Sequence, residues 1–241
     1  HESSANVSNT DGFIVKSGST FNHNSGTLKF MGSQYTSSSH SSIPITVVDI
    51  PTSLTLNNMI VDIGSTAISS SSYAKSHLEI TDGDTLVVNG DLTIEDGSIN
   101  DGVIDLKGNL IANCVDGEGN DHCAGDREVT SSYDGRFGGG TTEIVFSGNV
   151  PQTYDFDVGA RVPYVTINTT STVSAAAGTT FSTDGFKLVN GTFNAPTGEM
   201  RIGYRSGWGE ENTTKGFVIN GGTFNHNNGS VSIDHWGKQS G

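Results

Sequence analysis

The sequence is poor in the features that build thick globular cores, membrane-spanning helices or basic binding surfaces. Only 33% of its 241 residues are hydrophobic, so its core must be thin or finely divided. No run approaches the roughly 18 consecutive apolar residues that a membrane-spanning helix needs, and we expect no membrane insertion. The 12 basic residues face 26 acidic ones, and the net charge of −14 excludes nucleic acid as an expected partner because phosphates would repel the chain.

Cysteine is also scarce, and the two that occur lie close together. Cys114 and Cys123 enclose a short polar segment, which favours a local disulfide in an oxidising compartment. Two free thiols are the alternative. We expect residues 113–140 to form an insertion loop, because the alternation of apolar and polar residues breaks between Ala112 and Thr141.

Turn-forming and polar strand residues take the place of the missing hydrophobic ones. Charged residues make up only 16%, so charge repulsion does not explain the low hydrophobicity, whereas the 32 glycines and many Ser, Thr, Asn and Asp residues do. Short apolar–polar–apolar alternations bounded by such residues indicate strands and exclude long amphipathic helices. They occur at residues 54–56, 61–63, 78–80, 92–94 and 165–167.

Internal repeats are the strongest signal in the chain. GSTFNHNSGTLKF at residues 18–30 returns as GGTFNHNNGSVSI at residues 221–233, with looser copies at 191–203 and 97–108 and a partial one at 144–148. The shared template is Gly, Thr or Ser, a large apolar residue, Asn, a polar turn, Gly, and two apolar residues separated by one. Such a unit predicts a strand end, a tight turn and a short strand.

Many short strands can build a parallel β-solenoid (β-helix) or, alternatively, a β-sandwich or jelly roll. Repetition of one turn–strand unit favours the all-β solenoid, in which coils stack on one another. We expect a single elongated repeat domain over residues 1–241, with repeat units near 13–32, 97–108, 137–148, 185–203 and 217–234. The predicted interior residues are Phe21, Leu28, Phe30, Leu92, Ile94, Ile104, Leu106, Phe193, Met200, Ile202, Phe224, Val231 and Ile233.

The GSTFNHNSGTLKF pattern, with LVVNGDLTIEDGSI at residues 86–99, resembles repeats of large bacterial surface and secreted proteins of the β-helix, adhesin-like type. The resemblance covers most of the chain. It implies export, elongation and surface display, and therefore an extracellular or cell-surface location. It brings no catalytic residues that could be assigned to this sequence.

An acidic cluster inside the cysteine loop predicts a cation site. Asp116, Glu118, Asn120 and Asp121 place oxygen ligands along a Gly-rich loop that suits a hard cation such as Ca²⁺. The spacing departs from an EF-hand loop, since Arg127 stands where the terminal bidentate Glu belongs. A solvated insertion loop is the alternative.

Other acidic residues form a series that we expect to be a solvated face. The alternative is that stacked coils align some of these carboxylates, where a cation would relieve their repulsion. Paired carboxylates can serve glycoside hydrolysis, but no enzyme signature accompanies them, so we expect no enzyme. A polysaccharide lyase or hydrolase is the alternative. The members of the series are Asp82, Asp84, Asp91, Glu95, Asp96, Asp101 and Asp105.

Aromatic and histidine side chains are the remaining candidates for a binding or catalytic role. Tyr204, Trp208 and Trp236 are candidate sugar-binding residues because their faces stack on sugar rings, although both tryptophans would equally suit a loop junction. His23 and His226 occupy the same repeat position, which indicates a turn preference rather than a catalytic base.

The sequence therefore predicts an extracellular structural or adhesive repeat protein that assembles end to end or belongs to a longer surface protein. A carbohydrate-binding or polysaccharide-degrading β-helix protein is the alternative. The expected partners are further copies of the chain or a surface glycan. Uncapped ends of stacked strands recruit another strand, and residues 2–8 or 232–239 are candidates for that joining strand.

Overall fold

The computed structural model describes residues 12–31, 45–63, 67–69, 72–73, 77–113, 141–157, 160–204 and 216–235. Every regular element in these ranges is a β-strand, so they contain no helix that could cross a membrane. Strand pairs are parallel, apart from the antiparallel hairpin of β6 (Ala67–Ser69) and β7 (Ser72–Tyr73). The predicted all-β class is confirmed for this part of the chain.

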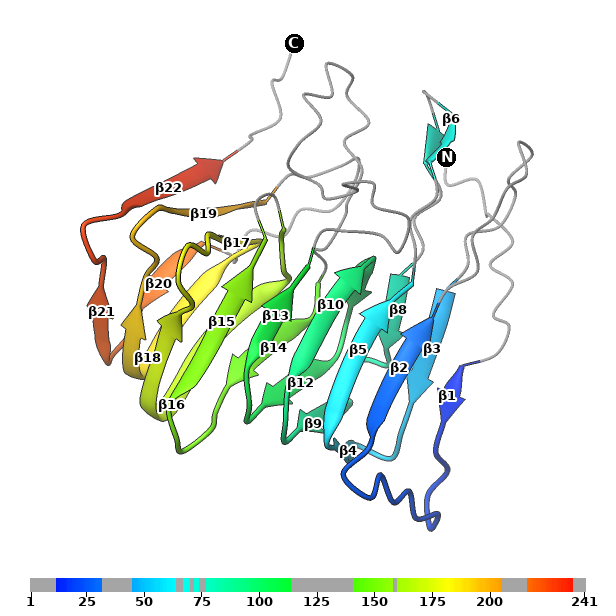
Figure 1. Ribbon diagram of the computed structural model, residues 1–241. Coiled ribbons are helices and arrows are strands. Elements are labelled where there is room, and N and C mark those ends of the chain that lie inside the picture. The colour runs from blue at the N-terminus through cyan, green and yellow to red at the C-terminus, as the bar shows by residue number, and fades with distance from the viewer. Residues whose placement is uncertain are drawn as a thin grey trace.

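The described strands fall into three positions, and most strands of one position pair in parallel with strands from an earlier or later pass of the chain (Figure 1). The first position holds two separate sheets, one of β1 (Phe13–Ile14), β3 (Ile45–Asp49), β8 (His77–Ile80) and β11 (Ser98–Asn100), and one of β17 (Phe181–Thr183), β19 (Glu199–Tyr204) and β22 (Ser230–His235). The second holds β4 (Ser53–Leu56), β9 (Thr85–Val88), β12 (Val103–Leu106), β14 (Glu143–Phe146) and β20 (Phe217–Ile219). The third holds β2 (Thr27–Met31), β5 (Asn58–Asp62), β10 (Leu92–Asp96), β13 (Leu110–Ala112), β15 (Gln152–Phe156) and β21 (Thr223–Asn225).

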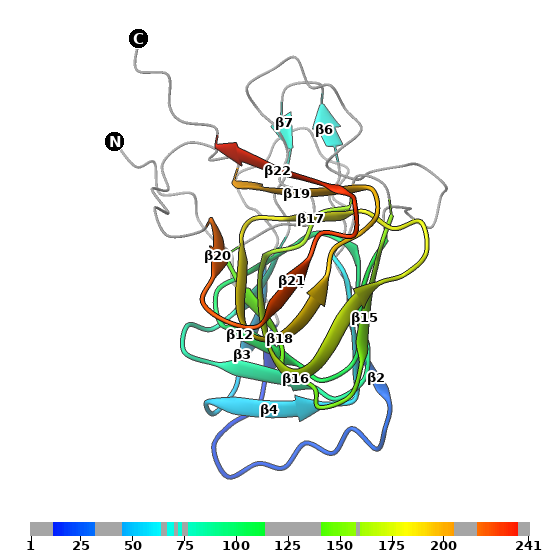
Figure 2. The same cartoon turned by 90° about the vertical axis from the view of Figure 1, so that its left-hand side faces the viewer.

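Two long strands join the second and third positions into one sheet of 13 strands. The first part of β16 (Tyr164–Ala175) pairs with β14, and its last part pairs with β15. The long strand β18 (Phe186–Asn194) likewise pairs with β20 and with β21. Seen from the end in Figure 2, the strands enclose a narrow interior.

The core is a set of apolar columns inside this enclosure. Alternate residues of each strand point inward, and parallel pairing aligns them between neighbours, as in the column Leu86, Ile104 and Ile144, all 0% exposed. Burying each such side chain contributes about 1.5–3 kcal/mol. The five predicted strand segments all lie in or at the end of observed strands.

The predicted interior holds except at the ends of the fold. Eight of the predicted residues are buried, namely Phe30, Leu92, Ile94, Ile104, Leu106, Phe193, Met200 and Ile202. Phe21, Leu28, Phe224 and Val231 are partly buried and pack against the core. The prediction for Ile233 is wrong, because its side chain is 59% exposed. Ile233 is aligned with buried Ile202, but β22 pairs only with β19 among the described strands, so one flank stays uncovered.

The repeat copies occur at different corners of the fold. The copy at 97–108 runs from the first position to the second, through β11 and β12. The copies at 191–203 and 221–233 run from the third position to the first. The copy at 18–30 runs from the segment between β1 and β2 into the third position. The repeated motif therefore spans a corner together with parts of the strands on both sides, and it occurs at more than one corner of the fold.

Candidate functional site

Several predicted site residues fall outside the part of the chain that the structure describes. They are the cysteines Cys114 and Cys123, the cation ligands Asp116, Glu118, Asn120 and Asp121, and the tryptophans Trp208 and Trp236. Tyr204 ends β19, but its side chain is not among those described. Within the described ranges, no three His, Cys, Asp or Glu side chains are grouped to hold a metal ion. The disulfide, the calcium site and the sugar site stay predictions.

The acidic series separates into residues with distinct structural partners. Asp84 is buried, and its Oδ2 accepts a hydrogen bond from the Ile50 backbone N–H at 3.0 Å. Asp101 is exposed at a corner and accepts a hydrogen bond from the Thr141 hydroxyl at 2.9 Å. The expected solvated face is therefore only partly correct. Asp84 connects two successive passes of the chain around the fold, which we call circuits, and it does so inside the fold.

A lysine links three neighbouring strands on the outer surface. Lys29 Nζ on β2 lies 2.8 Å from Asp62 Oδ2 on β5 and 2.9 Å from Glu95 Oε2 on β10. Hydrogen bonds to Asp62 and Glu95 raise the pKa of Lys29. All three side chains are about one third exposed, so solvent screens this network and its contribution to stability is small.

A line of polar side chains runs along the third strand position, and we call it the polar ladder. Each member directly follows or precedes inward-facing residues, and its own side chain faces outward. Its members, in order along the fold, are Thr27, Asn58, Asp91, Asn109, Thr153, Ser174, Asn194 and Asn225.

Hydrogen bonds connect the first part of the polar ladder from strand to strand. Asn58 Nδ2 reaches Thr27 Oγ1 at 3.5 Å, and the Asp91 N–H donates to Asn58 Oδ1 at 2.9 Å. Asn109 donates to Asp91 Oδ1 through its backbone N–H at 3.2 Å and its Nδ2 at 2.9 Å. Thr153 donates to Asn109 Oδ1 through its N–H at 2.8 Å and its hydroxyl at 2.9 Å.

The second part of the polar ladder continues the same pattern. Thr153 and Ser174 are register partners, Asn194 Nδ2 donates to Ser174 Oγ at 2.9 Å, and Asn225 Nδ2 donates to Asn194 Oδ1 at 2.8 Å. The polar ladder thus spans the third position from β2 to β21. Side-chain hydrogen bonds of this kind fix the register of stacked strands.

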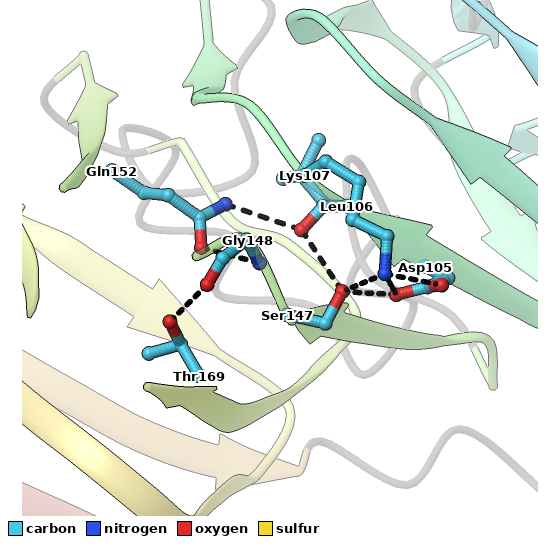
Figure 3. A network of polar contacts seen from close by, with 7 residues as sticks. All are labelled: Asp105, Leu106, Lys107, Ser147, Gly148, Gln152 and Thr169. Carbon is cyan, nitrogen blue, oxygen red and sulfur yellow. Dashed lines mark hydrogen bonds and ion pairs between the residues drawn. The ribbon is translucent and has the colours of Figure 1, made fainter. Parts of the chain in front are cut away.

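Figure 3 shows a second polar network at the corner between β14 and β15. Gln152 is 1% exposed, and its Nε2 donates to the carbonyls of Leu106 (3.1 Å) and Gly108 (2.5 Å). Its Oε1 accepts from the Gly148 N–H at 3.0 Å, and the Thr169 hydroxyl donates to the Gly148 carbonyl. One carboxamide therefore satisfies backbone groups of two circuits that the turn would otherwise leave unpaired.

The outer side of this corner carries charge. Lys107 Nζ lies 2.8 Å from Asp105 Oδ2 and 2.9 Å from Ser147 Oγ, and the Ser147 hydroxyl also donates to Asp105. These three residues link β12 to the turn after β14 (Figure 3). The carboxylate of Asp105 thus binds both the Lys107 ammonium group and the Ser147 hydroxyl.

Two tyrosines, the buried Tyr154 and the partly buried Tyr164, also belong to the fold. The Tyr154 hydroxyl donates to the Asn194 carbonyl at 2.9 Å, and burial raises the pKa of this phenol. Burial raises the pKa of Tyr164 as well, with the nearby Glu143 carboxylate adding to the effect. Both side chains are therefore neutral at physiological pH.

The two repeat histidines occupy identical turns, as the sequence indicates. His23 Nδ1 accepts from the Ser25 N–H at 3.1 Å, and His226 Nδ1 accepts from the Asn228 N–H at 3.2 Å. Their role as turn-forming residues is confirmed.

No protein-family model, curated protein or solved structure matches this chain. The features that extend furthest along the described fold are the polar ladder and the apolar columns behind it. Sequence reasoning missed the polar ladder, although a signal was present. In the first part of the polar ladder a polar residue stands directly before the first inward residue of a strand, as with Asn58 before Met59, Asp91 before Leu92 and Asn109 before Leu110.

Proposed function

We propose that this chain is an extracellular structural or adhesive repeat protein, built as a parallel β-solenoid, that assembles end to end or forms part of a longer surface fibre. The observation that carries the proposal is the polar ladder from Thr27 to Asn225, whose two parts are hydrogen-bonded through side chains and meet at the register partners Thr153 and Ser174. Continuous apolar columns accompany it inside, and together they make one stiffened stack.

A stack of this kind suits a load-bearing or spacing role. Neighbouring circuits are held by backbone hydrogen bonds, by the side-chain bonds of the polar ladder and by columns of aligned apolar residues. Separating two circuits breaks all three sets together, because each connects the same pair of strands. The polar side chains of the ladder are therefore engaged in holding the stack together.

An acidic surface fits the same role outside the cell. The net charge of −14 keeps separate stacks soluble by mutual repulsion along their sides. Contact through the ends, where inward-facing apolar residues such as Ile233 and Ile219 are 59% and 48% exposed, is then favoured over contact along the sides.

The test combines light scattering and electron microscopy of the purified chain with incubation on a panel of acidic and neutral polysaccharides. We expect concentration-dependent elongated assemblies, lengthened by moderate salt, and no release of reducing sugar or unsaturated product. Turnover of any polysaccharide would overturn the structural role. Compact monomers at all concentrations, with no binding to cells or glycans, would overturn it as well.

A further inference from the structure

The two ends of the described fold carry the same circuit. Residues 12–31 read GFIVKSGSTFNHNSGTLKFM, and residues 216–235 read GFVINGGTFNHNNGSVSIDH. From Phe21 and Phe224 onward the two segments align without a gap. Each begins with an apolar strand (β1 or β20), continues through the sequence Phe-Asn-His-Asn into a turn, and ends with a second strand (β2 or β22) that follows the turn.

The aromatic pairs of the two circuits have the same geometry. The rings of Phe13 and Phe21 are 5.3 Å apart with an interplanar angle of 84°. The rings of Phe217 and Phe224 are 5.3 Å apart with an angle of 83°. All four are partly buried.

The turns of the two circuits also match in their backbone. Asn24 and Ser25 have positive φ angles of 46° and 61°, and Asn227 and Asn228 have 52° and 60°. In each turn a glycine N–H donates a hydrogen bond to the carbonyl of the histidine three residues earlier. The distance is 2.7 Å from Gly26 to His23 and 2.9 Å from Gly229 to His226. The two turns therefore present the same shape to a neighbour.

Within the chain, this motif already stacks on a copy of itself. Phe193 pairs in register with Phe224, and their rings are stacked at 5.8 Å. After the turn, Met200 pairs in register with Val231. The copy at 191–203 thus lies directly against the copy at 221–233, which shows that the motif is compatible with its own stacking.

Each end circuit has an open flank among the described residues. β20 and β21 pair only with β18, β22 only with β19, β1 only with β3, and β2 only with β5. The open flank at the C-terminal end and that at the N-terminal end lie on opposite ends of the stack (Figure 1). Unpaired strand edges of this kind recruit a further strand.

The strand positions of the two circuits differ by one. The N-terminal circuit runs from the first position (β1) to the third (β2), whereas the C-terminal circuit runs from the second (β20) to the first (β22). β22 is the last described strand, and the strand that follows it in the winding order belongs in the second position. A second copy turned by one strand position supplies β1 there, and the winding continues without overlap.

We propose that a second copy of this chain stacks head to tail, with its residues 12–31 on residues 216–235 of the first. Its β1 then pairs with β20, its Phe21 covers Phe224, and its β2 pairs with β22. Asn22 over Asn225 repeats the Asn194–Asn225 contact of the polar ladder. The interface rests on the end-to-end assembly in the proposed function, and because it is heterologous and does not close, it generates a filament.

The register can be tested with single-cysteine variants of the full chain. Thr20 and Thr223 are both exposed and are aligned in the proposed pairing. Register partners on parallel strands lie about 4.8 Å apart, which a disulfide can bridge. An equimolar mixture of Thr20→Cys and Thr223→Cys should form disulfide-linked dimers under mild oxidation, several-fold more than either variant alone. The wild-type chain reports any contribution of Cys114 and Cys123.

The matched control shifts the pair along the strand by two residues. A mixture of Thr20→Cys and Asn225→Cys places the two Cα atoms more than about 7 Å apart, beyond disulfide reach, and should give only the background of the single variants. Equal cross-linking of both mixtures would overturn the register. A second aligned mixture, Asn22→Cys with Asn225→Cys, should reproduce the dimer if one variant misfolds.

A charge at the interface separates the two proposals. Ile233→Asp should leave monomer unfolding unchanged but abolish assembly in light scattering, because Phe30 of the next copy would cover this position. Assemblies that persist in Ile233→Asp, without the aligned cross-link, would overturn this interface and leave the proposed function standing. A wild-type chain that stays monomeric at all concentrations, with no aligned cross-link, would overturn both the interface and the self-assembly.

Discussion

The middle circuits and the end circuits use the same alternation of residues but differ in burial. Leu86, Leu106 and Phe146 in the middle are 0% exposed, whereas Ile233 at the C-terminal end points to the same interior and is 59% exposed. Orientation is a property of the strand, since successive side chains alternate in direction. Burial requires a covered flank on both sides of the strand, which only the middle circuits have among the described residues.

The largest expected difference between the two regions concerns phenylalanine. Phe193 is 0% exposed and its ring stacks on Tyr154 at 5.5 Å, while its partner Phe224 is only partly buried. Phe193→Ala should lower the free energy of unfolding by about 3–5 kcal/mol, and Phe224→Ala by less than half as much. Denaturant unfolding of dilute monomer measures both, and equal losses would contradict the contrast.

The second-largest loss of stability is expected in the polar network around Gln152. Gln152→Leu keeps the size of the side chain but leaves the Leu106 and Gly108 carbonyls and the Gly148 N–H without their partner. We expect a loss of about 1–3 kcal/mol in the free energy of unfolding. The exposed neighbour Asn149 provides the control, since Asn149→Ala should change stability by less than about 0.5 kcal/mol. A neutral Gln152→Leu would show that the carboxamide is dispensable.

The polar ladder offers a smaller contrast between middle and end. Asn109 bonds to both Asp91 and Thr153, whereas Asn225 bonds to Asn194 alone in the polar ladder. Asn109→Ala should cost about 1 kcal/mol or more, and Asn225→Ala should cost less. Thermal unfolding of the two variants side by side gives the comparison, and the reverse order would refute a ladder that depends on two-sided pairing.

The smallest expected effect is the pH dependence of the Lys29 network near the N-terminal end. Because hydrogen bonds to Asp62 and Glu95 raise the pKa of Lys29, its contribution is fully present below the ordinary lysine pKa of about 10.4. It is lost as pH rises through the raised value. Lys29→Met should therefore differ from wild type at pH 8, by at most about 1 kcal/mol, and converge with it at high pH. High salt should shrink the difference, and a constant difference at all pH values would contradict the ionic origin.

The strands and most of their inward residues were predictable because they depend on local pattern. The alternations at 54–56 and 92–94 lie in β4 and β10, and Leu92 and Ile94 are buried as expected. Ile233 was not predictable in the same way. Its alternation is correct, but its exposure depends on whether another strand covers β22, which a repeat template does not state.

The outward polar positions of the polar ladder leave a signal in the sequence, but the partners within the ladder and the corner network could not be predicted because they are joined at irregular separations. Leu110 pairs with Leu92 on one side and with Tyr154 on the other, and the intervening chain is much longer in the second case. Gln152 reaches the Leu106 carbonyl across the same interval. Variable chain lengths between circuits hide the pairing from any search for a fixed period.

The sequence by itself determined the alternation of each strand and the shape of the repeated turns. In both turns a histidine Nδ1 accepts a backbone N–H two residues ahead, a contact that needs only local chain geometry. Only the tertiary structure decided which circuits are neighbours, and that one motif serves different corners. Those features depend on stacking between segments far apart in the chain, where backbone hydrogen bonds accept almost any sequence and side-chain packing selects the register.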